Sequence, residues 1–393
     1  MNSTDLIVRF REALEQELGE KLDVVLRAPR YYVDHPLKWL LEGAEKGDSL
    51  QKQALINTAQ AYLTIASKAN AEGSPNKKLL SWCKNKIVRA ANVPPLEDPD
   101  ATYDALADVY AALAEIRALG CLLALFENVD IPDKSGPDLV VQTTTGELVE
   151  VEVTTLRMAK NSARQLASFY CQTLEPCERL ENITPGIFGE QHVFIHGEPK
   201  PGEFTVDNAV HRFVEKALEE NKQLKGDKPA LLWLDLQFED HWACTPDEAW
   251  PLYVLREGRF RTGSLWLAHY GKQSSTPLLD SESITEGLPV NMRGIRYTTL
   301  RYSGYFRTKQ ARASAVVVLW PRCVVLFENP WTRQPLPQSF LEKIIALKWF
   351  DWPRSWVRLF WEDTQTAFKE LQCRIAWALE MIQGIARKAQ RDW

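Results

Sequence analysis

Cysteines are few in this chain, and none of them form a regular pattern. Seven occur among 393 residues, and no two of them are separated by only two residues. Disulfide frameworks and zinc knuckles rely on cysteines at short, regular spacings, so this distribution argues against both. Scattered thiols of this kind are typical of a reducing compartment, and the sequence therefore predicts a cytoplasmic protein.

Long hydrophobic runs are also missing. No uninterrupted apolar stretch reaches the roughly 18 residues that a membrane span requires. The first twenty residues lack the basic and apolar regions of a signal peptide. With 45% hydrophobic and 25% charged residues, the composition is that of an ordinary globular protein. The sequence therefore predicts no association with membranes.

Basic residues are not in excess, because the formal net charge is -5. This balance argues against a protein that coats nucleic acid over its whole surface, but it allows a local basic patch. A glycine-rich phosphate loop and an ordered Ser-His-Asp signature are absent as well. The sequence therefore gives no support to a P-loop nucleotide-binding enzyme or a serine hydrolase.

What the chain does contain is an acidic strand pair. Residues 136–141 and 146–155 flank a threonine-rich turn and predict a β-hairpin. In the second strand, valines alternate with Glu150 and Glu152, so both carboxylates should lie on one face, close to Asp138 on the paired strand. Neighbouring like charges repel, and the repulsion is relieved by a cation, by a raised pKa or by exposure to solvent.

The periodicity on either side of this hairpin predicts three regions. Residues 1–95 predict a helical N-terminal domain, followed by a linker rich in proline and acid. Residues 100–335 predict an α/β domain with a mixed sheet. Residues 336–393 predict a Trp-rich helical tail. Within the α/β domain, the expected helices cover residues 100–119, 158–180 and 207–225, and the expected strands cover 121–127, the hairpin, 191–196, 230–236, 264–270, 313–320 and 322–327.

This helix and strand order, with Pro137-Asp138 opening one strand and alternating glutamates on the next, resembles the PD-(D/E)xK nuclease superfamily. The resemblance implies a restriction-endonuclease-like αβββαβ core and a metal-dependent nuclease that hydrolyses phosphodiester bonds, with prokaryotic defence as a setting. It implies that Asp138 and Glu152 hold Mg²⁺ or Mn²⁺, and that Glu115 is the acid contributed by the first helix. Glu150 could hold a second ion or orient the attacking water.

The family's lysine is missing from its usual place, and several arrangements are open. If Glu152 is the acid, the lysine position is Thr154; if Glu150 is the acid, it is Glu152. Alternatively, Lys160 reaches the site from the following helix. In the last alternative the catalyst is degenerate, and the fold serves as a nucleic-acid- or protein-binding module.

A second candidate site lies in residues 292–312, where basic and aromatic residues are interleaved. Arginines pair with phosphates, and aromatic rings can stack on unpaired bases. The alternative is a surface strand pair with solvated arginines. The predicted partner is nucleic acid, with DNA favoured over RNA; the N-terminal helices and the Trp-rich tail are candidate surfaces for a protein partner or a homodimer. The candidate nucleic-acid-binding residues are Arg293, Arg296, Arg301, Tyr302, Arg307, Lys309 and Arg312.

Overall fold

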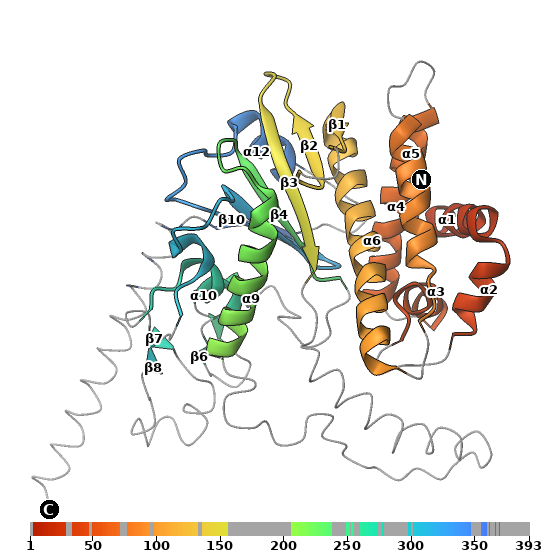
Figure 1. Ribbon diagram of the computed structural model, residues 1–393, viewed down its shortest axis with the longest axis horizontal. Coiled ribbons are helices and arrows are strands. Elements are labelled where there is room, and N and C mark those ends of the chain that lie inside the picture. The colour runs from red at the N-terminus through yellow and green to blue at the C-terminus, as the bar shows by residue number, and fades with distance from the viewer. Residues whose placement is uncertain are drawn as a thin grey trace, which may run out of the picture.

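A computed structural model gives the fold of the protein (Figure 1). It describes residues 3–28, 34–46, 49–70, 77–94, 98–132, 136–155, 206–237, 249–251, 253–254, 260–261, 263–273, 277–278, 298–299, 302–346, 355–359, 361, 366 and 369. The predicted helix 158–180 and the predicted strand 191–196 lie outside these residues.

Helices make up the first part of the chain, as predicted. In α1, Leu6, Phe10, Leu14 and Leu18 are all buried, which is the spacing of one helix face. The last and longest of these helices, α6, begins after Asp98, whose side chain accepts hydrogen bonds from the first turn. The bounds are α1 Ser3–Leu18, α2 Glu20–Leu26, α3 Pro36–Lys46, α4 Ser49–Asn70, α5 Lys77–Ala90 and α6 Pro99–Leu125.

The predicted end of α6 at Gly120 was wrong. The helix continues to Leu125, and the first strand begins only at Asn128. Gly120 has a packing role: a Cβ there would lie 2.4 Å from the Cα of Ala61, so the glycine lets α4 and α6 cross in close contact. The first three residues after Gly120 are all buried, and periodicity cannot tell such a run from a buried strand.

Seven strands form one mixed sheet in the order β1-β2-β3-β4-β9-β10-β11. The predicted hairpin is confirmed, because β2 and β3 pair antiparallel with Leu139 opposite Val151. The predicted pairing of the strands on either side of Pro321 is confirmed as well. Pairs β3/β4, β4/β9 and β10/β11 are parallel. The strands are β1 Asn128–Asp130, β2 Leu139–Gln142, β3 Leu148–Thr155, β4 Ala230–Asp235, β9 Ala315–Leu319, β10 Cys323–Glu328 and β11 Ser355–Leu359.

Two further predictions were wrong. Ser264–Tyr270, predicted as a strand, is the helix α10, and all seven of its residues are buried. Ser355–Leu359, predicted as part of a helical tail, is β11, where Arg358 forms a two-bond ion pair with Glu328 of β10. Both segments take their conformation from long-range contacts. The remaining elements are α9 Val206–Glu220, η2 Asn221–Gln223, β5 Tyr253–Val254, β6 Phe260–Arg261, β7 Pro277–Leu278, β8 Thr298–Thr299, η5 Tyr305–Arg307 and α12 Gln338–Ile345.

A hydrophobic core lies on each face of the sheet. Val149, Val151 and Val153 face a cluster that also contains residues of the N-terminal helices, α6 and α12. The other face packs against α9 and α10. Figure 1 shows α1–α6 beside the sheet and α9 in front of it. The first core is therefore continuous from Phe10 to Ile344, across the predicted boundary near residue 95.

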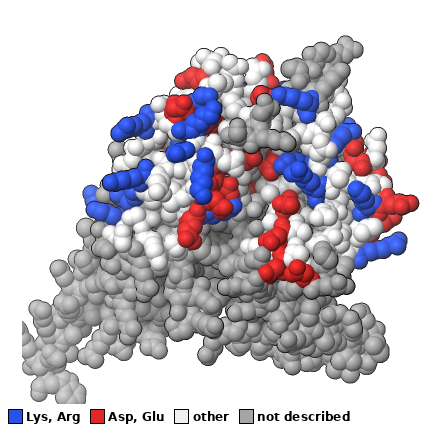
Figure 2. Space-filling model, in the orientation of Figure 1, with Lys and Arg blue, Asp and Glu red and all other residues white. Residues whose placement is uncertain are grey.

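Between α9 and α6 the surface is hollowed, and Lys, Arg, Asp and Glu side chains line both sides of the hollow (Figure 2). Among the helices of the described ranges, none combines the length and apolar character needed to cross a bilayer.

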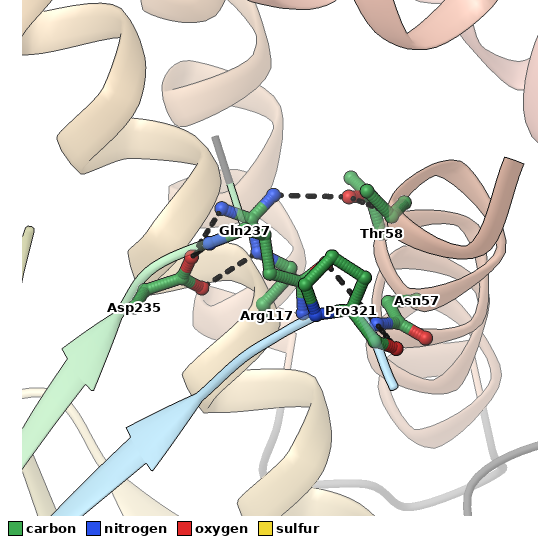
Figure 3. A network of polar contacts seen from close by, with 7 residues as sticks. Asn57, Thr58, Arg117, Asp235, Gln237 and Pro321 are labelled. Carbon is green, nitrogen blue, oxygen red and sulfur yellow. Dashed lines mark hydrogen bonds and ion pairs between the residues drawn. The ribbon is translucent and has the colours of Figure 1, made fainter. Parts of the chain in front are cut away.

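A buried polar network fastens the N-terminal helices to the sheet (Figure 3). Arg117 of α6 donates two hydrogen bonds to Asp235 at the end of β4, at 2.7 and 3.0 Å, and a third to the Thr58 hydroxyl on α4 at 3.0 Å. Asn57, also on α4, donates to the Gln237 side chain and to the Pro321 carbonyl. Both members of the Arg117–Asp235 ion pair have fully buried side chains. The network therefore fixes α4 and α6 at the end of β4.

Candidate active site

Asp138 and Glu152 form a carboxyl pair at the junction of β2 and β3. The β2–β3 register places Asp138, just before β2, opposite Glu152. The Asp138 N–H donates to Glu152 Oε2 at 3.3 Å, and the Val153 N–H donates to Asp138 Oδ2 at 2.9 Å. Glu152 is only 1% exposed. The expected convergence of these two residues is therefore present in the structure.

The surroundings of Asp138 and Glu152 raise the pKa of both carboxyl groups. Burial, together with the charges of the nearby Asp138 and Glu220 carboxylates, raises the pKa of Glu152 to about 10. Burial also raises the pKa of Asp138, although hydrogen bonds from Val153 and Glu152 oppose the change. Glu152 is buried and Asp138 is half-buried, and two such carboxyl groups in hydrogen-bonding contact cannot both ionise without strong repulsion. The surroundings therefore favour the protonated form over the doubly ionised pair.

A carboxylate and a lysine reach this pair from two helices. Glu115 of α6 and Lys86 of α5 form an ion pair, with side chains 12% and 15% exposed. Burial and the charge of Asp138 raise the pKa of Glu115 to about 7, and the Lys86 ammonium opposes that rise. The same ammonium lowers the pKa of Asp138. The structure thus brings Glu115 close enough to Asp138 for their charges to interact.

Helix α9 contributes a second pair of opposite charges. Glu220 accepts a hydrogen bond from the Thr154 hydroxyl at 3.3 Å and forms an ion pair with Lys216 one turn earlier. The charge of Glu220 acts on both Asp138 and Glu152. Thr154, which takes the lysine position of the resembled family if Glu152 is the acid, is therefore hydrogen-bonded to α9.

Glu150 belongs to a different set of contacts. Its Oε2 accepts the Lys225 N–H at 3.1 Å, and its Oε1 lies 3.9 Å from Lys228 Nζ. These contacts attach β3 to the turn between α9 and β4. Asp138, Glu152 and Glu115 come together, whereas Glu150 is held by this turn. Lys160 lies outside the described residues.

Sequence reasoning missed Lys86, Lys216 and Glu220. Lys86 lies three residues after Cys83 and seven after Leu79, both of which are buried. That spacing puts it on the edge of the apolar stripe of the helix. The pattern could have singled out Lys86, whereas nothing local links α9 to β3.

The donor set suits a hard divalent cation in part. Within the described residues, no group of three or more His, Cys, Asp and Glu side chains is placed to hold a metal ion. Mg²⁺ commonly takes only one or two protein carboxylates and completes its shell with water and substrate phosphate. Asp138 and Glu152 supply such a pair of carboxyl groups, so the residues present fit this ion.

Several residues of the predicted nucleic-acid site are described. Tyr302 is 39% exposed and its ring stacks on His211, with centroids 4.2 Å apart. Lys309 and Arg312 are exposed. Arg307, by contrast, lies over the Trp331 and Trp361 rings at 4.4 and 4.6 Å and donates to the Tyr270 carbonyl, so packing accounts for it. Arg293, Arg296 and Arg301 lie outside the described residues.

Comparison of the chain with family models, with curated proteins and with solved structures found no match.

Proposed function

We propose that this protein is a metal-dependent nuclease of the PD-(D/E)xK type, which hydrolyses phosphodiester bonds in nucleic acid, with prokaryotic defence as its setting. The observation that carries the proposal is the Asp138–Glu152 pair on paired strands, with Glu115 beside it on the preceding helix. Among the described residues, the order α6, β1, β2, β3, α9 and β4 supports a restriction-endonuclease-like αβββαβ core.

Asp138 and Glu152 would hold Mg²⁺ or Mn²⁺ with both carboxyl groups ionised. When bound, such an ion polarises the scissile phosphate and lowers the pKa of bound water. The backbone N–H groups of Val153 and Asp138 orient the two carboxyl groups, because each donates to one of them. The antiparallel pairing of β2 with β3 therefore positions both carboxyl groups.

Glu115 is the proposed general base. A base works best when its pKa is near the working pH, and the pKa of Glu115 is raised to about 7 by burial and by Asp138. Lys86 is the proposed replacement for the missing strand lysine, since it is the cation that acts on both Glu115 and Asp138. Its ammonium would stabilise negative charge that develops on the phosphate.

The test is cleavage of labelled single- and double-stranded DNA and RNA with Mg²⁺ or Mn²⁺. We expect cleavage by the wild type and none by Glu152→Gln, whose amide can still hydrogen-bond to Asp138 but binds metal poorly. The matched control is Glu150→Gln, the same substitution two residues earlier on the strand, which should retain cleavage. Isothermal titration should show metal binding by the wild type and the control alone.

The role of Glu115 gives a separate prediction. The rate of cleavage at low substrate concentration should rise with pH up to about 7 and then level off, because a base must be ionised to act. Glu115→Gln should lose roughly 100-fold or more in rate and show no such rise. A wild-type profile that is flat between pH 5 and 8 would contradict this role.

The second candidate function is a non-catalytic module that binds nucleic acid or protein. Two observations favour it: Thr154, the lysine position if Glu152 is the acid, is hydrogen-bonded to Glu220, and Lys86 is ion-paired with Glu115. In that case the wild type cleaves none of the substrates and takes up no metal, while Glu152→Gln binds partners as the wild type does.

A further inference from the structure

Two segments distant in sequence lie side by side at the C-terminal end of α9. The Asn221 side chain donates to the Gln310 carbonyl and accepts from the Arg312 N–H at 2.9 Å. The Arg312 guanidinium in turn donates to the Leu224 carbonyl. Gly226, with a positive φ of 76°, turns the chain against the Arg312 side chain. Residues 221–228 and 307–312 therefore form one continuous surface.

This surface carries mostly positive charge. Asp227 is the only acidic residue in either segment. The side chains of Lys222, Lys225, Lys309 and Arg312 are exposed, and Lys228 is half-buried. Figure 2 shows Lys and Arg gathered over the end of α9 and the turn into β4. We call the set Lys222, Lys225, Lys228, Lys309 and Arg312 the basic strip.

The basic strip is attached to the strand that carries the acidic pair. Glu150 binds the Lys225 N–H and faces the Lys228 ammonium. Glu152 is two residues further along β3 on the same face, a separation of roughly 7 Å at the usual rise of a strand. Glu220, two residues before Lys222 at the end of α9, accepts from the Thr154 hydroxyl of β3 and forms an ion pair with Lys216. A chain bound along the basic strip would reach the candidate active site with little bending.

We propose that the basic strip binds the phosphate backbone of the nucleic-acid substrate and leads it to Asp138 and Glu152; this rests on the proposed nuclease function. The stacked Tyr302 and His211 rings favour nucleic acid over an acidic protein. His211 lies eleven residues before Lys222 along α9 and its short extension, a distance of roughly 16 Å at helical rise. Phosphates would contact the lysines while a base stacks on the exposed Tyr302 ring.

The test measures binding without cleavage, by fluorescence anisotropy of 30-nucleotide DNA and RNA probes in EDTA over a range of salt concentrations. The variant is Lys222→Gln with Lys225→Gln and Lys309→Gln, which replaces three exposed lysines. The matched control is Lys21→Gln with Lys52→Gln and Lys68→Gln, three exposed lysines on α2 and α4. Circular dichroism verifies that both proteins are folded.

We expect the strip variant to bind about tenfold or more weakly at 0.1 M salt and to lose roughly 2 to 3 from the slope of log affinity against log salt, because each released phosphate contact contributes about 0.9. The control should match the wild type. Equal slopes for the variant and the control would overturn the proposal. So would displacement of the probe by poly-glutamate as effective as by nucleic acid of equal charge, which would indicate an acidic protein partner.

The two proposals fail in different ways. If the strip variant binds weakly and the wild type cleaves nothing with any metal, the nuclease function is refuted. The basic strip then remains a surface that binds nucleic acid. If the strip variant cleaves and binds as the wild type does, the proposed role of the basic strip is refuted and the nuclease function stands.

Discussion

The protonation of Glu152 affects the stability of the fold. Its pKa is raised to about 10 in the folded chain by burial and by neighbouring carboxylates, whereas an ordinary glutamate ionises near 4.5. Between these values the folded state binds more protons than the unfolded state, so the free energy of unfolding falls as pH rises. Glu115 acts in the same direction between about 4.5 and 7.

Replacing Glu152 with glutamine should remove much of this dependence. Between pH 5 and 8, we expect the free energy of unfolding of the wild type to fall by about 1–3 kcal/mol relative to that of Glu152→Gln. Urea denaturation at four pH values gives the comparison. The exposed control Glu12→Gln should follow the wild type. Parallel curves for all three proteins would show that Glu152 ionises normally.

Arg117 and Asp235 illustrate the other kind of buried charge, in which each member satisfies the other. Asp235→Asn leaves a buried guanidinium without its counter-charge, which should lower the free energy of unfolding by about 3–5 kcal/mol. Arg117→Met combined with Asp235→Leu removes both charges and should recover most of that loss. A double variant as unstable as the single one would mean that the hydrogen bonds to Thr58 and Gln237 matter more than the ion pair.

The crossing of α4 and α6 depends on one missing side chain. In an exposed helix, Gly→Ala stabilises by about 1 kcal/mol, but at Gly120 the new Cβ would meet Ala61 at 2.4 Å. We expect Gly120→Ala to lower the free energy of unfolding by about 1–3 kcal/mol, measured in urea. Adding Ala61→Gly should restore part of it, because one of the clashing atoms is removed. A stabilised Gly120→Ala protein would contradict the close crossing.

At the level of elements, sequence reasoning succeeded where the pattern is local. The alternation in β3 and the Thr-rich turn predicted the hairpin and its valine face correctly, because strand pairing and turn chemistry are properties of adjacent residues. It failed for α10, β11 and the end of α6. In each case a short apolar run takes the conformation that its distant neighbours require, and periodicity alone does not reveal these neighbours.

The residues of the candidate site also divide into those that a local pattern predicts and those that only long-range packing brings together. Asp138 and Glu152 could be paired from the sequence because one hairpin register brings them together. Lys86 and Glu220 could not, because their approach depends on how α5 and α9 pack on the sheet. Glu150 shows the reverse error: it shares a face with Glu152, yet the turn at Lys225 and Lys228 engages it.

At the scale of the whole molecule, the continuous core and the Arg117 network should make the chain unfold as one unit. We expect native-state hydrogen exchange to give α4 and β4 amides the same opening free energy. Asn57 of α4 donates to Gln237 just after β4, and Thr58 of α4 accepts from Arg117, which is paired with Asp235 of β4. The measurement is exchange against low urea concentrations. Earlier opening of α4 would instead support an N-terminal domain that ends near residue 95.

The Lys86–Glu115 ion pair bears on the modularity of the chain. Lys86 precedes the proline-rich linker, whereas Glu115 and the acidic pair follow it. A chimera that exchanged residues 1–95 for another helical module would keep Glu115 and the acidic pair but lose Lys86, the cation that is paired with Glu115. A recombination boundary near residue 95 would therefore separate the charges that meet at this place in the folded chain.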